Sequence, residues 1–182
     1  SFNLDEYYPV SPENPQSYRY FMETHLFSLV NIPRENIHIP NGLAEDPEKE
    51  CEEYDKALKR AGYPDLQLLG IGRNGHIGFN EPGAFLLCNT HQTRLAPSTV
   101  DANARFFSSA SDVPQTALTM GVGGIMKSKT VILIAVGKEK KEAVSALMKN
   151  RITPDIPATL LLAHPDFHLF CDKDAYPSEN NN

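Results

Sequence analysis

The sequence predicts an α/β fold built on a mostly parallel sheet flanked by helices, and three observations support it. Segments with helical periodicity alternate with short apolar segments, which favours parallel strands joined by helices. Residues 130–136 are apolar after the first position and rich in β-branched side chains, as in a strand covered on both faces. Residues 66–71 form another apolar segment, which leads into a glycine-rich turn. A chain of 182 residues can bury one core, so we expect a single domain over residues 1–173.

The first half of the chain contains two predicted helices and two predicted strands. Aromatic and aliphatic residues recur at helical spacing over residues 18–29, and we expect this stripe to face the core. Residues 37–39, bounded by prolines, predict a short strand. A second helix is predicted over residues 54–61, with two basic residues in its last turn and Gly62 as its end. Residues 66–71 then predict a buried strand.

The second half continues the alternation. We predict a helix over residues 113–126, a fully apolar strand over 130–136 and a helix over 139–149. A short helix over 157–163 and a strand over 167–171 complete the pattern. The positions of the helix 139–149 that we expect to face inward are Ala143, Val144, Leu147 and Met148.

Composition narrows the functional classes. With 23 acidic and 17 basic residues the net charge is −6, which argues against a general nucleic-acid binder. No run of about 18 apolar residues predicts a membrane span, and no secretory signal pattern is present, so we expect a cytoplasmic protein without membrane partners. The cysteines are odd in number and widely spaced, which predicts reduced thiols and no metal site at Cys51, Cys88 and Cys171. Residues 174–182 are polar, and we expect this tail to be disordered.

The most informative segment is residues 69–83, where an apolar strand runs into a turn that carries an imidazole and, five residues later, a carboxylate. Ligands of open parallel sheets bind beyond the carboxyl ends of the strands, where glycines allow a close approach of the backbone. His76 and Glu81 are therefore candidate acid–base partners. The residues alone are also compatible with a plain turn at Asn74 and Gly75, a structural histidine, and a glutamate that only marks the start of the next segment.

Three separated blocks of the sequence carry a resemblance to a known family. Residues 70–83, the segment 2–7 (Phe-Asn-Leu-Asp-Glu-Tyr) and the segment 103–107 (Asn-Ala-Arg-Phe-Phe) together resemble the glucosamine-6-phosphate deaminase (glucosamine/galactosamine-6-phosphate isomerase) family. The resemblance implies the three-layer, Rossmann-like fold of the deaminase/6-phosphogluconolactonase superfamily. It also implies an isomerase/deaminase of amino-sugar catabolism, formally a hydrolase of a C–N bond. Such an enzyme converts the small sugar phosphate glucosamine 6-phosphate into fructose 6-phosphate and ammonia without a metal or cofactor.

The resemblance implies catalytic roles for Asp5, Asn74, His76 and Glu81. Asp5 matches the base that moves a proton from C2 to C1, a role that suits a carboxylate. His76 matches the group that opens the sugar ring, and Asn74 and Glu81 match the pair that holds and polarises its imidazole. Many relatives carry Asp at the position of Asn74. An amide orients the ring but does not balance an imidazolium charge, so more of that task falls to Glu81.

Two basic residues, Arg105 and Lys140, match the phosphate-binding positions of the family. A guanidinium binds phosphate through paired donors, whereas a lysine supplies a point charge. The residues by themselves leave alternatives open. Lys140 lies in a charged run typical of a solvated helix start, and Arg105 is flanked by aromatic rings over which it could pack. Asp5, close to the start of the chain, is likewise compatible with a solvated strand end.

Other functions stay open at this point. Family members carry an additional N-terminal segment with a phosphate-binding loop that has no counterpart in these residues, so we expect a domain that is incomplete at its N-terminus. A 6-phosphogluconolactonase-like hydrolase shares the fold and a similar loop but needs no base at C2. Asp5 and the Phe-Asn-Glu-Pro sequence at 79–82 therefore favour the deaminase. An inactive fragment or a sugar-phosphate-binding module is the further alternative, and the choice between monomer and homo-oligomer is undetermined.

Overall fold

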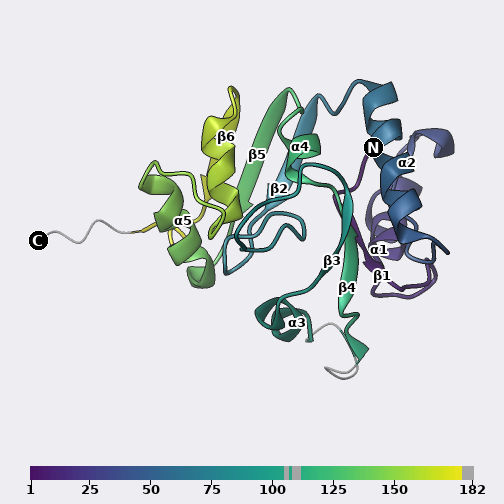
Figure 1. Ribbon diagram of the computed structural model, residues 1–182, viewed down its shortest axis with the longest axis horizontal. Helices are drawn as coiled ribbons and strands as arrows, with labels where there is room; N and C mark the ends of the chain where they lie inside the picture. Colours follow the sequence, from purple (N-terminus) through teal and green to yellow (C-terminus); the bar gives the residue numbers. More distant parts are fainter. Residues whose placement is uncertain (105–106, 108–111, 178–182) are drawn as a thin grey trace, which may run out of the picture.

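The computed structural model describes residues 1–104, 107 and 112–177, and it confirms an α/β fold with a parallel sheet and helices (Figure 1). Its strands are β1 (Asp5–Tyr8), β2 (Leu66–Gly70), β3 (His91–Arg94), β4 (Thr116–Thr119), β5 (Thr130–Ala135) and β6 (Phe167–Cys171). Its α-helices are α1 (Tyr18–His25), α2 (Pro47–Ala61), α3 (Pro97–Asn103), α4 (Val122–Ile125) and α5 (Lys141–Met148). Short 3-10 helices lie at Phe27–Leu29, Arg34–Asn36, Lys138–Lys140 and Pro157–Ala163.

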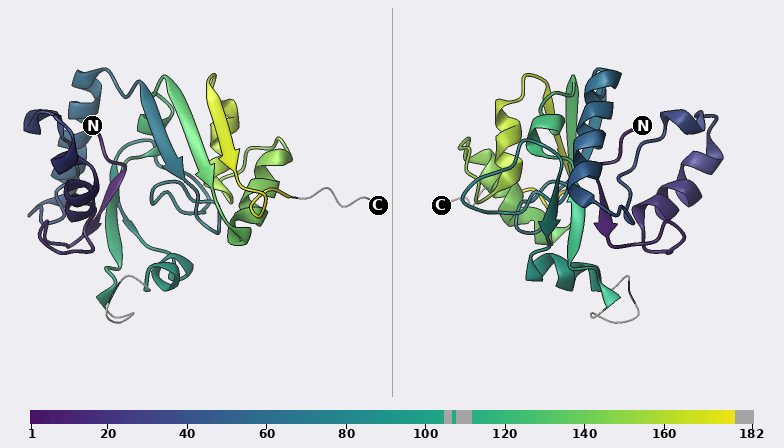
Figure 2. Two further views of the ribbon diagram at one scale, coloured as in Figure 1. Left: turned by 180° about the vertical axis from the view of Figure 1, so that it is seen from behind. Right: turned by 45° about the vertical axis from the view of Figure 1, so that its right-hand side comes forward.

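The predicted parallel sheet has the strand order β2-β5-β6, and its strands lie side by side toward the viewer in the left view of Figure 2. Alternate side chains of the strands point to one face, where they form the main core with residues of α2, α4, α5 and the 3-10 helix Pro157–Ala163. The opposite face exposes apolar side chains in the described part of the chain. These are Leu66, Leu68, Ile134 and Phe170.

The second sheet is antiparallel, in the order β1-β4-β3, and it corrects the helix predicted over residues 113–126. The middle of that segment is β4, which pairs with β1 on one edge and β3 on the other, with Ala117 and Leu118 fully buried. Helix α4 occupies only four residues after Gly121. Pairing on both edges of β4 outweighs a helical periodicity that three glycines in the segment already weaken.

The predicted end of α2 at Gly62 is confirmed, whereas its predicted start at residue 54 is wrong. Asp46 is the N-cap, and its side chain accepts a hydrogen bond from the Lys49 N–H at 3.0 Å. Gly62 ends the helix with φ of +81°, a conformation that a residue with a Cβ rarely adopts. The helix begins at Pro47, earlier than its apolar period alone predicts.

The aromatic stripe that we expected to face the core is largely exposed. It forms α1 and the 3-10 turn that follows, and no residue of α1 is buried. Phe21 has 52% of its surface exposed and Leu29 has 73%. Helix α1 rests on β1 through its first turn, where the rings of Tyr18 and Tyr7 stack with centroids 5.3 Å apart. The stripe is also covered at Phe27, which is buried with Ile37 and Ile39, and Met22 packs against this cluster.

Three smaller expectations are also corrected. The strand predicted at residues 37–39 is reduced to one bridge between His38 and Phe2, because the proline that follows has no N–H to extend the ladder. Met148, at the last position of α5, is half exposed, whereas the other three predicted inward residues of that helix are buried. The polar tail is ordered at its start, where Ala175 is fully buried.

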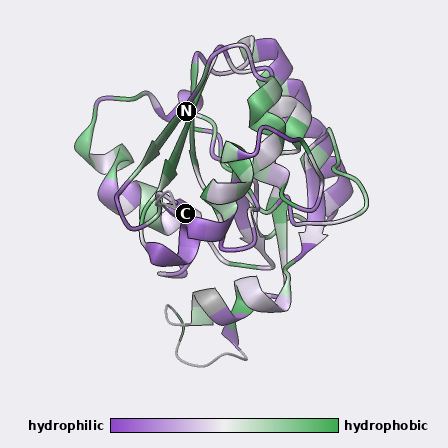
Figure 3. Ribbon diagram, turned by 90° about the vertical axis from the view of Figure 1, so that its left-hand side faces the viewer, coloured by the Kyte–Doolittle hydropathy of each residue, from purple (hydrophilic) through white to green (hydrophobic). Residues whose placement is uncertain are grey.

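Hydropathy follows this architecture. The darkest green in Figure 3 lies on strands, such as β5 with the sequence Thr-Val-Ile-Leu-Ile-Ala, whereas β3 has the hydrophilic sequence His-Gln-Thr-Arg. No helix in the described part of the chain is long and apolar enough to cross a bilayer. The cysteines are unpaired, as predicted, with Cys51 buried and Cys88 exposed.

Burial in β5 predicts a large difference between two neighbouring substitutions. Leu133 is fully buried in the core, whereas Ile134 points to the outer face with 42% of its surface exposed. We expect Leu133→Ala to lower the free energy of unfolding by about 2–5 kcal/mol because it leaves a cavity. Ile134→Ala should lower it by less than about 1.5 kcal/mol. Urea unfolding followed by circular dichroism measures both, and equal losses would contradict the assigned faces.

Candidate active site

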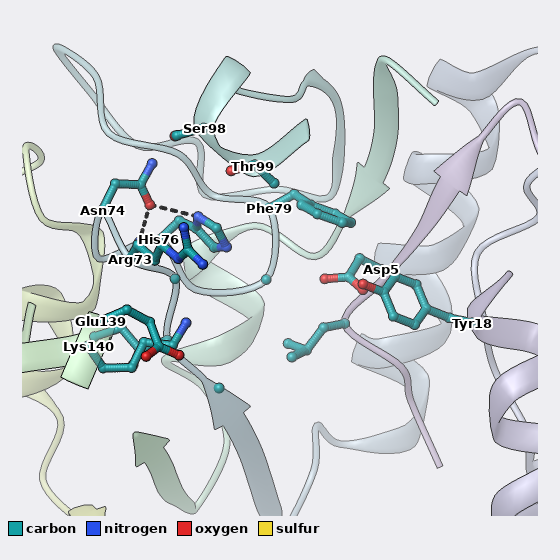
Figure 4. Close-up of a pocket in the computed structure, with 15 residues that line it drawn as sticks. Asp5, Tyr18, Arg73, Asn74, His76, Phe79, Ser98, Thr99, Glu139 and Lys140 are labelled. Carbon is teal, nitrogen blue, oxygen red and sulfur yellow. Dashed lines mark hydrogen bonds between the residues drawn. The ribbon is translucent and has the colours of Figure 1, made fainter. Parts of the chain in front are cut away.

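A pocket of about 280 Å³ lies between the two sheets. Residues that follow β2 form one wall, the 3-10 helix Lys138–Lys140 after β5 forms a second, and β1 with α1 forms a third (Figure 4). Parallel strands end at the same edge of a sheet, so the segments after β2 and β5 meet there. The loop predicted to carry the chemistry is therefore at this pocket.

His76 is held by a chain of short hydrogen bonds that runs away from the pocket. The Asn74 side-chain oxygen lies 2.7 Å from His76 Nδ1, and the Asn74 Nδ2 donates to Glu81 Oε2 at 2.7 Å. Because the amide nitrogen donates to the carboxylate, the amide oxygen is an acceptor, and Nδ1 carries the proton. This leaves His76 Nε2 as the proton acceptor.

At two positions of the loop, the absence of a Cβ leaves room for neighbouring atoms. A Cβ on Gly72 would lie 2.3 Å from the ring of His76, so a larger residue there would displace the imidazole. Gly78 has φ of +58°, and a Cβ on it would lie 3.0 Å from Thr119 Oγ1 and 3.4 Å from Asp5 Oδ2. The loop thus approaches β1 and β4 closely because it lacks side chains at these positions.

Glu81 lies behind His76 and is strongly stabilised as a carboxylate. Its Oε2 is 3.3 Å from His76 Nδ1, and its Oε1 accepts a hydrogen bond from Thr99 Oγ1 at 2.6 Å. Burial opposes ionisation, but the hydrogen bond and charge of His76, followed by the hydrogen bonds of Thr99 and Asn74, lower the pKa of Glu81 to about 2. Glu81 is therefore a permanent anion at neutral pH.

Asp5 lies on the opposite side of the pocket from His76 (Figure 4). It is the first residue of β1 and pairs in register with Thr119 of β4. Burial, together with the neighbouring charge of Glu6, raises the pKa of Asp5 to about 7. A carboxyl group with this pKa can both accept and return a proton near neutral pH. The alternative of a solvated strand end is therefore wrong.

Glu6, the next residue along β1, fixes α1 at the pocket. Its fully buried carboxylate accepts hydrogen bonds from the backbone N–H groups of Tyr7 and Tyr18, both at 2.9 Å, and of Arg19 at 2.8 Å. This places Tyr18 beside Asp5 in the pocket wall (Figure 4). We had assigned Tyr18 only to the core stripe, because periodicity does not distinguish a core ring from a pocket ring.

The positive side chains of the described pocket are on the wall formed by the parallel sheet. Lys140, one of the two predicted phosphate-binding residues, lines the pocket together with Glu139 of the same 3-10 helix. Arg73 also lines it, although the sequence analysis did not select this residue. The sequence feature that could have identified Arg73 is a basic residue inside the glycine-rich loop of an otherwise acidic chain. Arg105, the other predicted cation, lies outside the described residues.

The structure therefore brings Asp5, Asn74, His76 and Lys140 to one pocket, with Glu81 directly behind it. Thr99 also lines the pocket and was missed, because it is 18 residues from Glu81 and no local pattern links the two. Among the residues described, no group of three or more His, Cys, Asp or Glu side chains is arranged to hold a metal ion.

Comparison with known proteins adds to this geometry. The family model of glucosamine-6-phosphate isomerases/6-phosphogluconolactonase matches residues 2–169, which include every residue that lines the pocket. The chain belongs to this family. The resemblance found in the three sequence blocks is thereby confirmed.

Members of the glucosamine-6-phosphate isomerase/6-phosphogluconolactonase family named as deaminases are similar to almost the whole chain. This chain is 52% identical to the glucosamine-6-phosphate deaminase of Thermoanaerobacter pseudethanolicus over 175 aligned residues. The aligned residues make up 96% of this chain and 69% of the relative. It is 55% identical to the glucosamine-6-phosphate deaminase of Clostridium perfringens strain 13 over 175 aligned residues. These make up 96% of this chain and 72% of the relative. The chain thus spans about seven tenths of the length of these relatives.

Solved structures of family members share the fold. A monomeric glucosamine-6-phosphate deaminase superposes with a TM-score of 0.93 at 44% identity, over 96% of this chain and 72% of that one. A 6-phosphogluconolactonase from Thermotoga maritima superposes with a TM-score of 0.71 at 25% identity, over 93% of this chain and 70% of that one. The predicted superfamily fold is confirmed.

The raised pKa of Asp5 predicts that this residue destabilises the fold at alkaline pH. Its folded-state pKa of about 7 lies above its ordinary value of 3.8, so the fold favours the protonated form, and stability is lost as the pH rises from about 4 to 7 and then stays level. We expect Asp5→Asn to raise the free energy of unfolding at pH 8 by about 2 kcal/mol. The gain should shrink towards pH 4. Urea unfolding at both pH values measures it.

Asp65→Asn is the matched control, because Asp65 is highly exposed and pairs with Lys129 on the surface. This variant should show no gain that grows with pH. An Asp5→Asn variant no more stable than the wild type at pH 8 would show that Asp5 is not held in an environment that opposes its charge.

Proposed function

We propose that this chain is a glucosamine-6-phosphate deaminase, which converts glucosamine 6-phosphate and water into fructose 6-phosphate and ammonia. The observation that carries the proposal is the placement of Asp5, with a pKa raised to about 7, across one pocket from the oriented imidazole of His76. The reaction needs one group that opens the sugar ring and another that moves a proton between two carbons. The names of the relatives at 52% and 55% identity support the same assignment.

His76 opens the sugar ring. With Nδ1 donating to Asn74, Nε2 accepts the proton of the anomeric hydroxyl, and the ring then returns a proton to the ring oxygen as the C1–O bond breaks. The imidazole becomes positive between these two transfers. Glu81, a permanent anion 3.3 Å from Nδ1, stabilises that charge, while the neutral Asn74 fixes the orientation of the ring.

Asp5 moves the proton that converts the aldose into the ketose. It removes the hydrogen from C2, and the same carboxyl group delivers this proton to C1, while one proton leaves the amine nitrogen and one is added to the C1 oxygen; the products of this step are a C1 hydroxyl group and an imine at C2. Water adds to the imine carbon, and the C–N bond breaks to release ammonia. The overall reaction is therefore a hydrolysis of a C–N bond coupled to an aldose–ketose isomerisation. A group with a pKa of about 7 suits a base that must also return its proton.

The wall of the parallel sheet suits the phosphate of the substrate. Lys140 and Arg73 bring positive charge to one side of the pocket in a chain whose net charge is −6. A local pair of cations attracts and orients a phosphate that the acidic protein as a whole would repel. Arg105 is the third cation that we assign to the phosphate, on the residues of its sequence block alone.

The lactonase alternative is not favoured. Opening a lactone needs an activated water but no base above C2, and it leaves the placement and raised pKa of Asp5 without a use. The similarity to the Thermotoga lactonase, at 25% identity, is also lower than the 44% identity to the deaminase structure. A phosphorylated amino sugar as substrate supports a role in cytoplasmic amino-sugar catabolism.

The decisive test is the release of ammonia and fructose 6-phosphate from glucosamine 6-phosphate. We expect the wild-type chain to form both products in equal amounts. Asp5→Asn should lower kcat by about 10²–10⁴-fold, since it removes the general base and leaves the shape of the side chain unchanged. Coupled assays for ammonia and for the ketose phosphate measure the two products.

Asp65→Asn serves again as the control and should leave the rate unchanged, because its carboxylate is on the surface. Hydrolysis of 6-phosphogluconolactone without ammonia release, at a rate that Asp5→Asn does not alter, would favour the lactonase instead. Absence of both reactions in a folded wild-type chain would contradict the proposed activity.

The pH dependence of the rate gives a further prediction. Asp5 acts as a base only when ionised, so kcat/KM should fall about tenfold per pH unit below pH 7 and level off above it. The midpoint should lie near pH 7 and not near the ordinary carboxyl value of 3.8. A rate that stays constant from pH 8 to pH 5 would show that Asp5 is not the base with the raised pKa.

A further inference from the structure

Helix α3 contributes one residue to the hydrogen bonds behind His76. Thr99, whose surface is 4% exposed, donates its hydroxyl proton to Glu81 Oε1 at 2.6 Å. The other oxygen of the same carboxylate, Oε2, accepts from Asn74 and lies 3.3 Å from His76 Nδ1. The two oxygens of Glu81 therefore bind different segments, Oε1 on the α3 side and Oε2 on the imidazole side.

The Thr99 hydroxyl is the strongest contact that the structure gives to Oε1. The other donor to this oxygen is the backbone N–H of Ala96, at 3.4 Å. A carboxylate held by one oxygen only can rotate about its last side-chain bond, whereas a short hydrogen bond on each oxygen fixes its plane. Fixing that plane also fixes the direction from which Oε2 meets Asn74.

We propose that Thr99 is a positioning residue, which orients Glu81 and, through Glu81 and Asn74, aligns the imidazole of His76. This inference rests on the proposed function. Helix α3 must then be seated against Glu81 for the ring-opening group to be aligned. The position of a helix that also lines the pocket through Ser98 is thereby coupled to the reacting imidazole.

A purely structural role for Thr99 makes a different prediction. Thr99 is in the first turn of α3, and its N–H donates to the Ala96 carbonyl at 2.9 Å, so a substitution could act only on the helix. Such an effect would be independent of Glu81. An effect transmitted through Glu81 disappears when Glu81 is removed, and a double-mutant cycle distinguishes the two.

The test uses Thr99→Val, which keeps the shape of the side chain and removes the hydroxyl. We expect kcat for glucosamine 6-phosphate to fall about tenfold with KM changed less than about twofold, because a hydrogen bond to a charged group is lost. Thr99→Ser should restore most of the rate. In a Glu81→Ala background, Thr99→Val should change kcat by less than about 1.5-fold.

Thr93→Val on β3 is the matched control, since the Thr93 hydroxyl donates to the neighbouring Arg94 carbonyl, at 3.5 Å, and not to Glu81. This substitution should leave kcat unchanged in both backgrounds. A full tenfold effect of Thr99→Val in the Glu81→Ala background would overturn the proposal. A rise in KM with kcat unchanged would also overturn it, because it would mark Thr99 as a ground-state contact of the substrate.

A spectroscopic measurement separates this inference from the proposed function. If the wild-type chain releases no ammonia, the proposed function fails, and the role of Thr99 is judged from the imidazole ¹⁵N shifts of His76. The wild type should show one tautomer with the proton on Nδ1, and Thr99→Val should show exchange with the other tautomer. Identical spectra for the two proteins would overturn the positioning role.

Discussion

The placement of Asp5 relative to His76 depends on buried hydrogen bonds that join the two sheets. The buried side-chain amide of Asn80, at the end of the glycine-rich loop, donates to the Met120 carbonyl at 2.9 Å. A backbone N–H of the same loop donates to Thr119 Oγ1 at 3.0 Å. Thr119 is the partner of Asp5 in the antiparallel register, so these bonds fix the imidazole loop against the strand of the carboxylate.

This arrangement gives two carboxyl groups opposite electrostatic environments. Burial, together with the neighbouring charge of Glu6, raises the pKa of Asp5 to about 7. Glu81 is also buried, but donors surround it, and its pKa falls to about 2. Separating the proton affinities of two carboxyl groups in this way assigns one to proton transfer and the other to charge stabilisation. Glu6, buried beside Asp5, widens the difference between the pKa values of Asp5 and Glu81, because the charge of Glu6 raises the pKa of Asp5.

The two sheets contribute different parts of the site. The carboxyl ends of the parallel strands supply His76 and the positive side chains, since such strands all end at one edge. The antiparallel sheet supplies Asp5 and, through β1, the support for Tyr18. Helix α3 closes a further side through Thr99.

The sequence by itself determined the parallel strands, the C-terminal end of α2 and the loop that carries His76, because apolar runs, caps and glycines act within a few residues. It also determined the family, since its motifs are local. Only the tertiary structure decided that residues 116–119 form a strand, because β4 is stabilised by partners more than 20 residues away along the chain. The same holds for the pKa of Asp5 and for the contact of Thr99 with Glu81. Burial and side-chain contacts between distant segments exist only once the chain has folded.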